Sequence, residues 1–348
     1  MENNKVKHYI KNVLENMPLG WLTTTTHRLD IYDEALAKTA FLDKFEALFN
    51  LDVFDTKSLN ELPTAYDYLR LGHPLSCILE WGIAKMNHLD TKSVISFSSN
   101  SSPILAILRK NLLQNTNTQI IYLRDDLAFL NPRVLKKVYG YRFTLKRVEN
   151  LNEIPAFNGT TIFVSKQDTI YNVNRSEHID FVVNYTPKLG SVVVVKGEEN
   201  KSYISEIQHV RRRETIAMTP ANCLVALQTL LQISVKETPS NLEANKASVL
   251  SSIKNITGTN TRPLVGSSGL SIQYAIMMGL IDHAMQHHPQ KAIKIVVPPN
   301  CYGGTNDQAR RVAALIDNVA VVDLPVDGDN DMVQSIDTVL AKIAQQDA

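Results

Sequence analysis

Apolar positions recur every three to four residues in many segments of this chain, which is the spacing that one face of an α-helix requires. Between these segments lie short runs rich in Val and Ile, which are typical of buried β-strands. The helical spacing predicts helices at 6–14, 35–51, 76–86, 104–113, 132–138, 202–213, 221–233, 242–253, 270–285 and 307–316, followed by a final helix. The β-branched runs predict strands at 93–97, 118–123, 141–145, 161–164, 179–183, 191–196, 292–297 and 319–324.

From residue 76 onward, helical segments and β-branched runs alternate. Alternation of this kind predicts an α/β fold in which a mostly parallel sheet is flanked by helices. A turn-rich stretch at 257–262 interrupts the alternation, and helix and strand patterns begin again after it. We therefore predict an N-terminal helical segment at 1–60, a first α/β domain at 61–257 and the start of a second one at 258–348.

Composition and charge exclude several classes of protein. The 348 residues carry 36 basic and 35 acidic side chains, so the net charge of +1 gives no general attraction to nucleic acid or to an anionic membrane. The apolar fraction of 44% is sufficient for a large core. Three widely separated cysteines, Cys77, Cys223 and Cys301, fit a reducing compartment and no disulfide framework, so a cytoplasmic location is expected. No segment has the pattern of a signal peptide or of a membrane span.

Two clusters of ionisable residues need no ligand to explain them. His283 and His287 have the i, i+4 spacing of a two-histidine metal site, but no glutamate follows His283 as it does in zinc proteases. We expect a solvated helix end there and no metal. Arg211, Arg212 and Arg213 are consecutive on a predicted helix and point in three directions, which favours a solvated face over a phosphate site.

Two glycine-containing turns are candidate ligand sites. The turn at 266–269 (Gly-Ser-Ser-Gly) precedes a strongly apolar helical segment, so its amides and the helix N-terminus would face one anion. The alternative is that its serine is only a helix N-cap. The turn at 298–305 follows a predicted strand and carries Tyr302 at the end where open α/β sheets bind ligands. The alternative here is a surface turn with a buried tyrosine.

Together the two turns resemble the signatures of the cysteine and methionine metabolism family of pyridoxal phosphate enzymes of fold type I, which includes cystathionine γ-synthase and cystathionine β-lyase. In that family a Ser-Gly turn with an apolar helix is followed by Tyr-Gly-Gly-Thr, as it is here at 302–305. The resemblance implies that Ser268, Gly269 and Leu270 hold the phosphate of pyridoxal 5'-phosphate and that Tyr302 stacks on its pyridine ring. Leu270 replaces the usual methionine, a mild departure because the expected contact is made by the backbone.

The first domain resembles the same family more faintly, through segments 66–74 and 97–100. This resemblance implies that Tyr68 and Arg70 reach the cofactor phosphate of a neighbouring subunit, a role that suits a guanidinium because it can bind phosphate through two hydrogen bonds. The alternative is that the two side chains pack a turn. Asn100 stands where the family has glycine, which weakens this domain's own phosphate turn because a Cβ hinders close approach of the backbone.

Segment 179–188 resembles the family's strand that ends in the Schiff-base lysine, so Lys188 is the candidate for that role. A lysine that bonds the cofactor and then carries the substrate's α-proton needs a lowered pKa. The turn that follows this lysine in the family, and the aspartate that pairs with the pyridine nitrogen, are missing around Lys188. The alternative is a solvated lysine at the end of a strand.

The first domain thus resembles a degenerate copy of the family and the second an incomplete copy with its cofactor motifs intact. The resemblance implies a pyridoxal-phosphate-dependent transsulfuration enzyme, incomplete as given, that eliminates or replaces a group at Cβ or Cγ of a sulfur amino acid or an activated homoserine. Its partners are expected to be that small-molecule substrate and either further copies of the chain or, in an intramolecular pseudo-dimer, its own other domain. In the pseudo-dimer, Tyr68 and Arg70 complete a site at Ser268 and Tyr302. The alternative is a noncatalytic pseudoenzyme or assembly module that keeps the fold and pairs with a catalytic chain.

Overall fold

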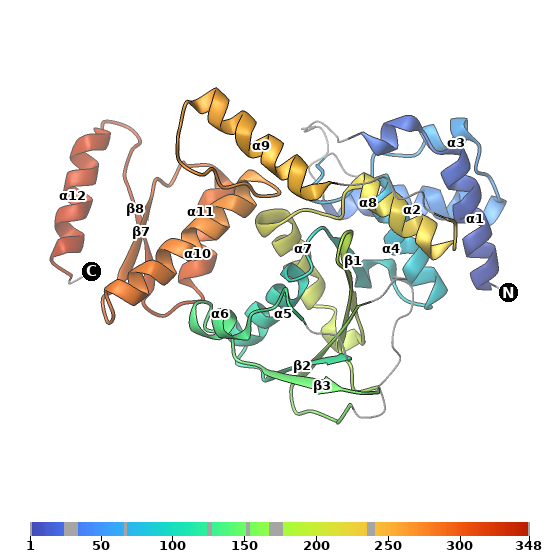
Figure 1. The fold of residues 1–348 in the computed structure, drawn as a ribbon, viewed down its shortest axis with the longest axis horizontal. Coiled ribbons are helices and arrows are strands. Elements are labelled where there is room, and N and C mark those ends of the chain that lie inside the picture. Colours follow the sequence, from blue (N-terminus) through green and yellow to red (C-terminus); the bar gives the residue numbers. More distant parts are fainter. Residues whose placement is uncertain are drawn as a thin grey trace.

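The protein, seen here in a computed structural model, is elongated, with its N-terminus and C-terminus at opposite ends of the long axis (Figure 1). The structure describes residues 2–23, 34–65, 68–123, 127–150, 154–166, 177–234 and 241–346. A first unit holds the large sheet and helices α1 to α8, and a C-terminal unit holds helices α10 to α12 and strands β7 and β8. None of the helices in the described ranges combines the length and the apolar character that a membrane crossing requires.

The helices are α1 (Glu2–Asn16), α2 (Glu34–Leu51), α3 (Thr56–Asn60), α4 (Pro74–Met86), α5 (Ser102–Leu113), α6 (Pro132–Lys137), α7 (Tyr203–Glu214), α8 (Pro220–Leu230), α9 (Leu242–Thr257), α10 (Gly269–His287), α11 (Gly303–Ala313) and α12 (Met332–Ala344). The strands are β1 (Val94–Phe97), β2 (Thr118–Leu123), β3 (Thr144–Val148), β4 (Thr160–Lys166), β5 (Phe181–Thr186), β6 (Gly190–Val195), β7 (Ile293–Val297) and β8 (Val319–Asp323). Short 3₁₀ helices lie at Leu19–Leu22, Thr91–Ser93 and Glu198–Asn200.

The large sheet has the strand order β1-β6-β5-β4-β2-β3. Strand β2 is parallel to β3 and β4, and β4 is parallel to β5, whereas β6 is antiparallel to both β5 and β1. These pairings confirm the expected α/β fold with a mostly parallel sheet flanked by helices. The antiparallel pairs all involve β6, which runs opposite to both of its neighbours. A tight turn at 187–189 joins β5 to β6, and a turn of that length connects only antiparallel neighbours.

The sheet separates two hydrophobic cores, because successive side chains of a strand point to opposite faces. Val192 and Val194 of β6 pack in one core with α1, α2, α4 and α8. Val193 and Val195 of the same strand pack in the other core, with α5 and α7. Met278 of α10 also belongs to this second core. The C-terminal unit is therefore packed against the face of the sheet that α5 and α7 cover.

In the C-terminal unit, β7 and β8 form a parallel pair, α11 packs on both strands and α10 packs on α7 of the first unit. Helix α9, which precedes this unit, has no buried residue. It ends at Gly258, whose left-handed conformation (φ 65°) caps the helix without the strain that a Cβ would cause. The domain limits at 60 and near 258 stay a prediction. Apolar side chains that precede residue 258 and others that follow it pack in the same core.

Strand β3 and helix α11 are among the elements that begin away from their predicted positions. Strand β3 begins at Thr144 rather than at 141, because Tyr141 and Phe143 are buried in the core ahead of the strand. Helix α11 begins at Gly303 rather than at 307, and Tyr302 is its N-cap residue. Glycine has a low helix propensity, which hid the first turn of this helix from the sequence pattern.

The prediction of a solvated face for the consecutive arginines of α7 is wrong for Arg211, of which only 1% is exposed. Its Nη1 atom donates a hydrogen bond of 2.8 Å to Oε1 of Glu80 in α4, and Nζ of Lys38 in α2 donates one of 2.5 Å to Oε2 of the same carboxylate. Burial raises the pKa of Glu80, but the two cations outweigh burial and lower that pKa to about 2. The three charges form a buried ion cluster that joins α2 and α4 to α7.

Candidate functional site

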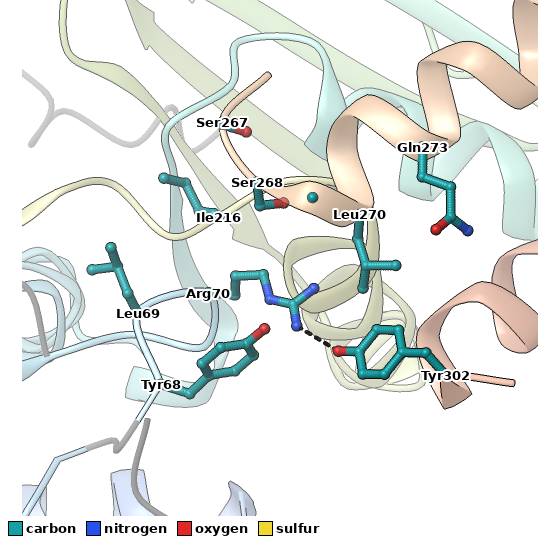
Figure 2. A pocket seen from close by; sticks show the side chains of 10 residues that line it. Tyr68, Leu69, Arg70, Ile216, Ser267, Ser268, Leu270, Gln273 and Tyr302 are labelled. Atoms are coloured by element: carbon teal, nitrogen blue, oxygen red, sulfur yellow. Dashed lines mark hydrogen bonds between the residues drawn. The ribbon is translucent and has the colours of Figure 1, made fainter. Parts of the chain in front are cut away.

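A pocket of about 510 Å³ lies where the first unit meets the C-terminal unit (Figure 2). Its walls come from four segments: the turn before α4, the segment after α7, the first turns of α10 and the start of α11. Every residue that the family resemblance assigned to cofactor binding lines this pocket: Tyr68, Arg70, Ser268, Gly269, Leu270 and Tyr302. The structure thus brings residues of the first unit and of the C-terminal unit to one cavity within a single chain.

The cation of the pocket is Arg70. It lies in the turn 68–71, which is closed by a hydrogen bond of 2.8 Å from the Leu71 amide to the Tyr68 carbonyl. Its guanidinium lies over the ring of Tyr68, 4.3 Å from the ring centroid, and its Nη2 atom donates a hydrogen bond of 3.1 Å to the hydroxyl oxygen of Tyr302. Only 7% of Arg70 is exposed. In the described part of the chain, no carboxylate forms an ion pair with it. A buried cation without a counter-ion is costly, so this side chain is suited to an anionic ligand.

The N-terminus of α10 lines the same pocket. Ser268 is the N-cap, and its hydroxyl oxygen accepts a hydrogen bond of 3.1 Å from the Ser271 amide. In return the Ser268 amide donates to the Ser271 hydroxyl over 2.8 Å, which completes a capping box. The expected cap is therefore present, and it leaves the amides of Gly269 and Leu270 without an acceptor among the described residues. Free amides at a helix start, together with the helix dipole, attract an anion.

Tyr302 lies opposite Arg70 at the start of α11 (Figure 2). Its ring is 60% exposed, so the alternative of a surface turn with a buried tyrosine is wrong about the ring. The turn fits closely against α10 because Gly304 has no side chain: a Cβ there would lie 2.7 Å from Cδ1 of Leu270 and 2.7 Å from Cε1 of Tyr302. Gly304 therefore allows the tyrosine to lie beside the first turn of α10.

Four further residues line the pocket: Leu69, Ile216, Ser267 and Gln273. Leu69 and Ser267 lie in the segments 66–74 and 266–269 that the sequence singled out, whereas Ile216 and Gln273 were not identified from the sequence. Ile216 reaches the pocket because its carbonyl accepts a hydrogen bond of 3.1 Å from the Ser98 amide, which fixes the segment after α7 to the end of β1. Isoleucine and glutamine carry no sequence signal for a ligand site, so only the packing of these segments reveals them.

The first domain's own Ser-Ser-Asn turn is occupied by protein contacts. The Ser99 carbonyl accepts a hydrogen bond of 2.6 Å from the Ser191 hydroxyl, and the Ser99 hydroxyl accepts one of 3.1 Å from the Ser102 amide. Helix α5 begins only at Ser102, two positions beyond Asn100. The degeneracy of this copy of the turn stays a prediction.

Lys188 lies exposed in the turn between β5 and β6 and is not among the residues that line the pocket. No other lysine lines the pocket within the part of the chain that the structure describes. The Schiff-base role of Lys188 stays a prediction, and its exposure agrees with the solvated alternative. Tyr66 and Asp67, which belong to the segment that resembles the family, lie outside the described residues.

An ion network holds the C-terminal unit on α7 beside the pocket. Oε1 of Glu206 in α7 accepts hydrogen bonds of 2.9 Å from Arg109 in α5 and 2.7 Å from Arg311 in α11. Burial raises the pKa of Glu206, but the two arginines outweigh it and hold that pKa below its usual value. Nearby, the Nε2 atom of His209 lies 2.9 Å from the Oδ2 atom of Asp307. These contacts fix α11, and with it Tyr302, relative to the first unit.

His283 and His287 lie on α10 with their ring centroids 4.0 Å apart. The Nδ1 atom of His287 is 2.8 Å from the carbonyl oxygen of His283. Across the described ranges, no group of three or more His, Cys, Asp or Glu side chains has an arrangement that would hold a metal ion.

Comparison with known proteins gives similarity in structure only. No protein-family model matches the sequence, and no curated protein matches it either. The crystal structure of metB from Corynebacterium glutamicum is similar over 56% of this chain and 60% of that chain, with 15% identity and a TM-score of 0.32. The chain therefore spans about three fifths of that structure's length. The structure of cystathionine gamma-lyase from yeast is similar over 71% of this chain and 68% of that chain, with 13% identity and a TM-score of 0.39.

Proposed function

We propose that the pocket between the two units binds pyridoxal 5'-phosphate, and that the chain is part of a transsulfuration-class enzyme acting at Cβ or Cγ of a sulfur amino acid or an activated homoserine. The observation that carries this proposal is the position of Arg70. Its buried guanidinium, with no carboxylate partner in the described part of the chain, lines the same cavity as the free amides of Gly269 and Leu270.

The phosphate of the cofactor fits the polar groups of the pocket. A guanidinium and backbone amides at a helix N-terminus are the groups that bind phosphate oxygens most directly. Arg70 and the Gly269 amide approach the cavity from different units, so that one phosphate bound between them would contact both. A phosphate would also supply the negative charge that the buried cation lacks.

The remainder of the cofactor fits the apolar groups. The rings of Tyr68 and Tyr302 and the side chains of Ile216 and Leu270 line the cavity. Its volume of about 510 Å³ lies in the range of sites for small organic ligands. Tyr302 is 60% exposed, so a pyridine ring in the pocket would have room to stack on its ring.

Bound pyridoxal phosphate supplies an aldehyde that reacts with amines and a ring that withdraws electrons from the substrate's α-carbon. The residues around this pocket bind the phosphate, orient the ring and shield one face of the ligand from water. They include no lysine in the described part of the chain, and Lys188 is exposed in a turn elsewhere. This observation favours the second candidate, a noncatalytic binding or assembly module that a catalytic chain completes.

Equilibrium binding of two non-reactive ligands tests the proposal. Pyridoxine 5'-phosphate has the ring and the phosphate of the cofactor but no aldehyde, so it does not form bonds with surface lysines. Pyridoxine lacks both the aldehyde and the phosphate. We expect calorimetry to show that the phosphate ester binds more tightly than pyridoxine. Arg70→Ala is expected to raise the Kd of the phosphate ester about 10- to 100-fold, the equivalent of a lost hydrogen bond to a charged group.

Arg133→Ala is the matched control, because Arg133 is an exposed residue of α6. It is expected to leave both dissociation constants unchanged. Equal affinity of the wild-type chain for the two ligands, or equal effects of the two arginine variants, would contradict the proposal. Borohydride reduction after addition of pyridoxal phosphate, followed by mapping of the labelled lysine, separates the two candidates. A single label on Lys188 would mean that the first domain carries a live site of its own, and scattered label or none supports the binding module.

A further inference from the structure

A chain of side-chain hydrogen bonds runs from the Tyr302 turn to the end of α7. The Thr305 hydroxyl donates to Oε1 of Gln273 over 2.9 Å, and Nε2 of Gln273 donates to Oε1 of Gln308 over 3.1 Å. Nε2 of Gln308 then donates two bonds, of 2.6 Å to the Arg213 carbonyl and 2.8 Å to the Leu270 carbonyl.

Gln308 is the centre of this chain, and it is only 1% exposed. Its oxygen accepts one hydrogen bond, and its nitrogen uses both hydrogens, so the amide has a single orientation that satisfies every contact. A buried amide that loses such partners pays the full cost of its desolvation. The network therefore resists rotation of Gln308 and sliding of the segments that it joins.

The segments that Gln308 joins are those that form the pocket. Leu270 lies in the first turn of α10, which presents the free amides. Arg213 lies at the end of α7, three positions before the pocket residue Ile216. Through Gln273, the same network reaches Thr305 in the first turn of α11, next to the Tyr302 turn. One side chain thus bonds the first unit and the C-terminal unit at the same time.

We propose that Gln308 is a positioning residue for the anion site: its two donated bonds fix the first turn of α10 against the first unit, so that the α10 amides and Arg70 contact the same phosphate. Gln308 does not line the pocket and acts through Leu270. This inference rests on the proposed function, because it assumes that a phosphate group binds at Arg70 and α10.

Two substitutions test the role. Gln308→Met keeps a side chain of similar length but removes all three hydrogen bonds, and Gln308→Ala also removes the packing. The readout is phosphate preference, the ratio of the Kd of pyridoxine to that of pyridoxine 5'-phosphate. We expect each variant to lower this ratio about tenfold, because the amides move out of line with Arg70 while the apolar walls remain. If Gln308 had only a structural role, its substitution would weaken the binding of both ligands equally and leave the ratio of the two Kd values unchanged.

A double-mutant cycle with Arg70→Ala adds a second readout. If the two residues act on one phosphate, Gln308→Met changes the phosphate preference of the Arg70→Ala chain by less than about twofold, so the two effects are not additive. Gln334→Ala is the control, since Gln334 is exposed on α12 of the same unit. Melting temperatures show whether each variant is folded, and Gln308→Met replaces Gln308→Ala if the latter unfolds.

The outcomes separate this inference from the proposed function. A wild-type chain without phosphate preference overturns the proposed function and this inference with it. A second outcome is that the wild-type chain prefers the phosphate ester, Arg70→Ala abolishes this preference and both Gln308 variants retain it. That outcome overturns the positioning role alone. Additive effects of Gln308→Met and Arg70→Ala overturn it as well.

Discussion

The Nη2 atom of Arg70 donates a hydrogen bond of 3.1 Å to the hydroxyl oxygen of Tyr302, which lies 232 positions further along the chain. This bond connects the turn before α4 with the start of α11, and both of its residues line one pocket (Figure 2). The tyrosine oxygen occupies a donor of the guanidinium. A phosphate that binds to the same donor has to displace it.

Removal of the Tyr302 hydroxyl is therefore expected to weaken the fold and strengthen phosphate binding. In Tyr302→Phe, Arg70 loses its side-chain acceptor, and the free energy of unfolding falls by about 1 kcal/mol. The ligand no longer competes with the hydroxyl, so the Kd of pyridoxine 5'-phosphate falls about fivefold. Tyr302→Ala, which also removes the ring, is expected to raise that Kd. Denaturant titration and calorimetry check both effects, and a Kd that rises equally in the two variants would contradict the competition.

The adjacent glycines of the Tyr302 turn provide a matched pair of substitutions. A Cβ at Gly304 would meet Leu270 and Tyr302 at 2.7 Å, whereas a Cβ at Gly303 has nothing within 4 Å. Gly304→Ala is expected to cost about 1–3 kcal/mol of stability and to weaken ligand binding, because the turn has to move away from α10. Gly303→Ala is expected to be neutral or stabilising, since alanine favours a helix start more than glycine does. Equal stability of the two variants in chemical denaturation would exclude a close fit at Gly304.

The ion cluster of Glu80, Lys38 and Arg211 is expected to make the free energy of unfolding depend on pH. The pKa of Glu80 falls from 4.5 to about 2 in the folded chain. A carboxyl with a lowered folded-state pKa stabilises the fold above the unfolded value and loses that contribution as the pH drops through the folded value. About 3 kcal/mol of stability at neutral pH is therefore expected to disappear between about pH 4.5 and pH 2. Urea denaturation over this range measures the loss.

Glu80→Gln tests the same cluster at constant pH. It leaves Lys38 and Arg211 buried without their anion, which is expected to cost about 3–5 kcal/mol at pH 7 and to flatten the acid dependence between pH 4.5 and 2. The control is Glu243→Gln, because Glu243 is exposed on α9. An acid dependence that survives Glu80→Gln unchanged would assign the effect to other carboxyls.

Sequence patterns located most strands because the buried ones are unbroken β-branched runs. The run 191–195 predicted β6 closely, but the pattern contained no information on its direction. Direction depends on the short turn at 187–189, which forces the antiparallel pairing with β5. The burial of Arg211 was also beyond the pattern, since it requires Glu80 from another helix to reach the same place.

The site was predictable as far as its motifs extend. Tyr68, Arg70, Ser268 and Tyr302 each stand in a segment that resembles a family signature, and the pseudo-dimer hypothesis placed them at one site. Gln308 has no such signal, because its role comes from the way α11 packs between α10 and the end of α7. Residues of this kind are found only when the contacts between the two units are known.

A crystal structure of the chain with pyridoxine 5'-phosphate bound tests most directly whether one ligand site is built from both units. The predicted result is a phosphate within hydrogen-bond distance of both the Arg70 guanidinium and the amides of Gly269 and Leu270, with the Arg70 to Tyr302 bond of 3.1 Å broken. A phosphate bound elsewhere, or one that contacts α10 while Arg70 keeps its bond to Tyr302, would contradict a site built from both units.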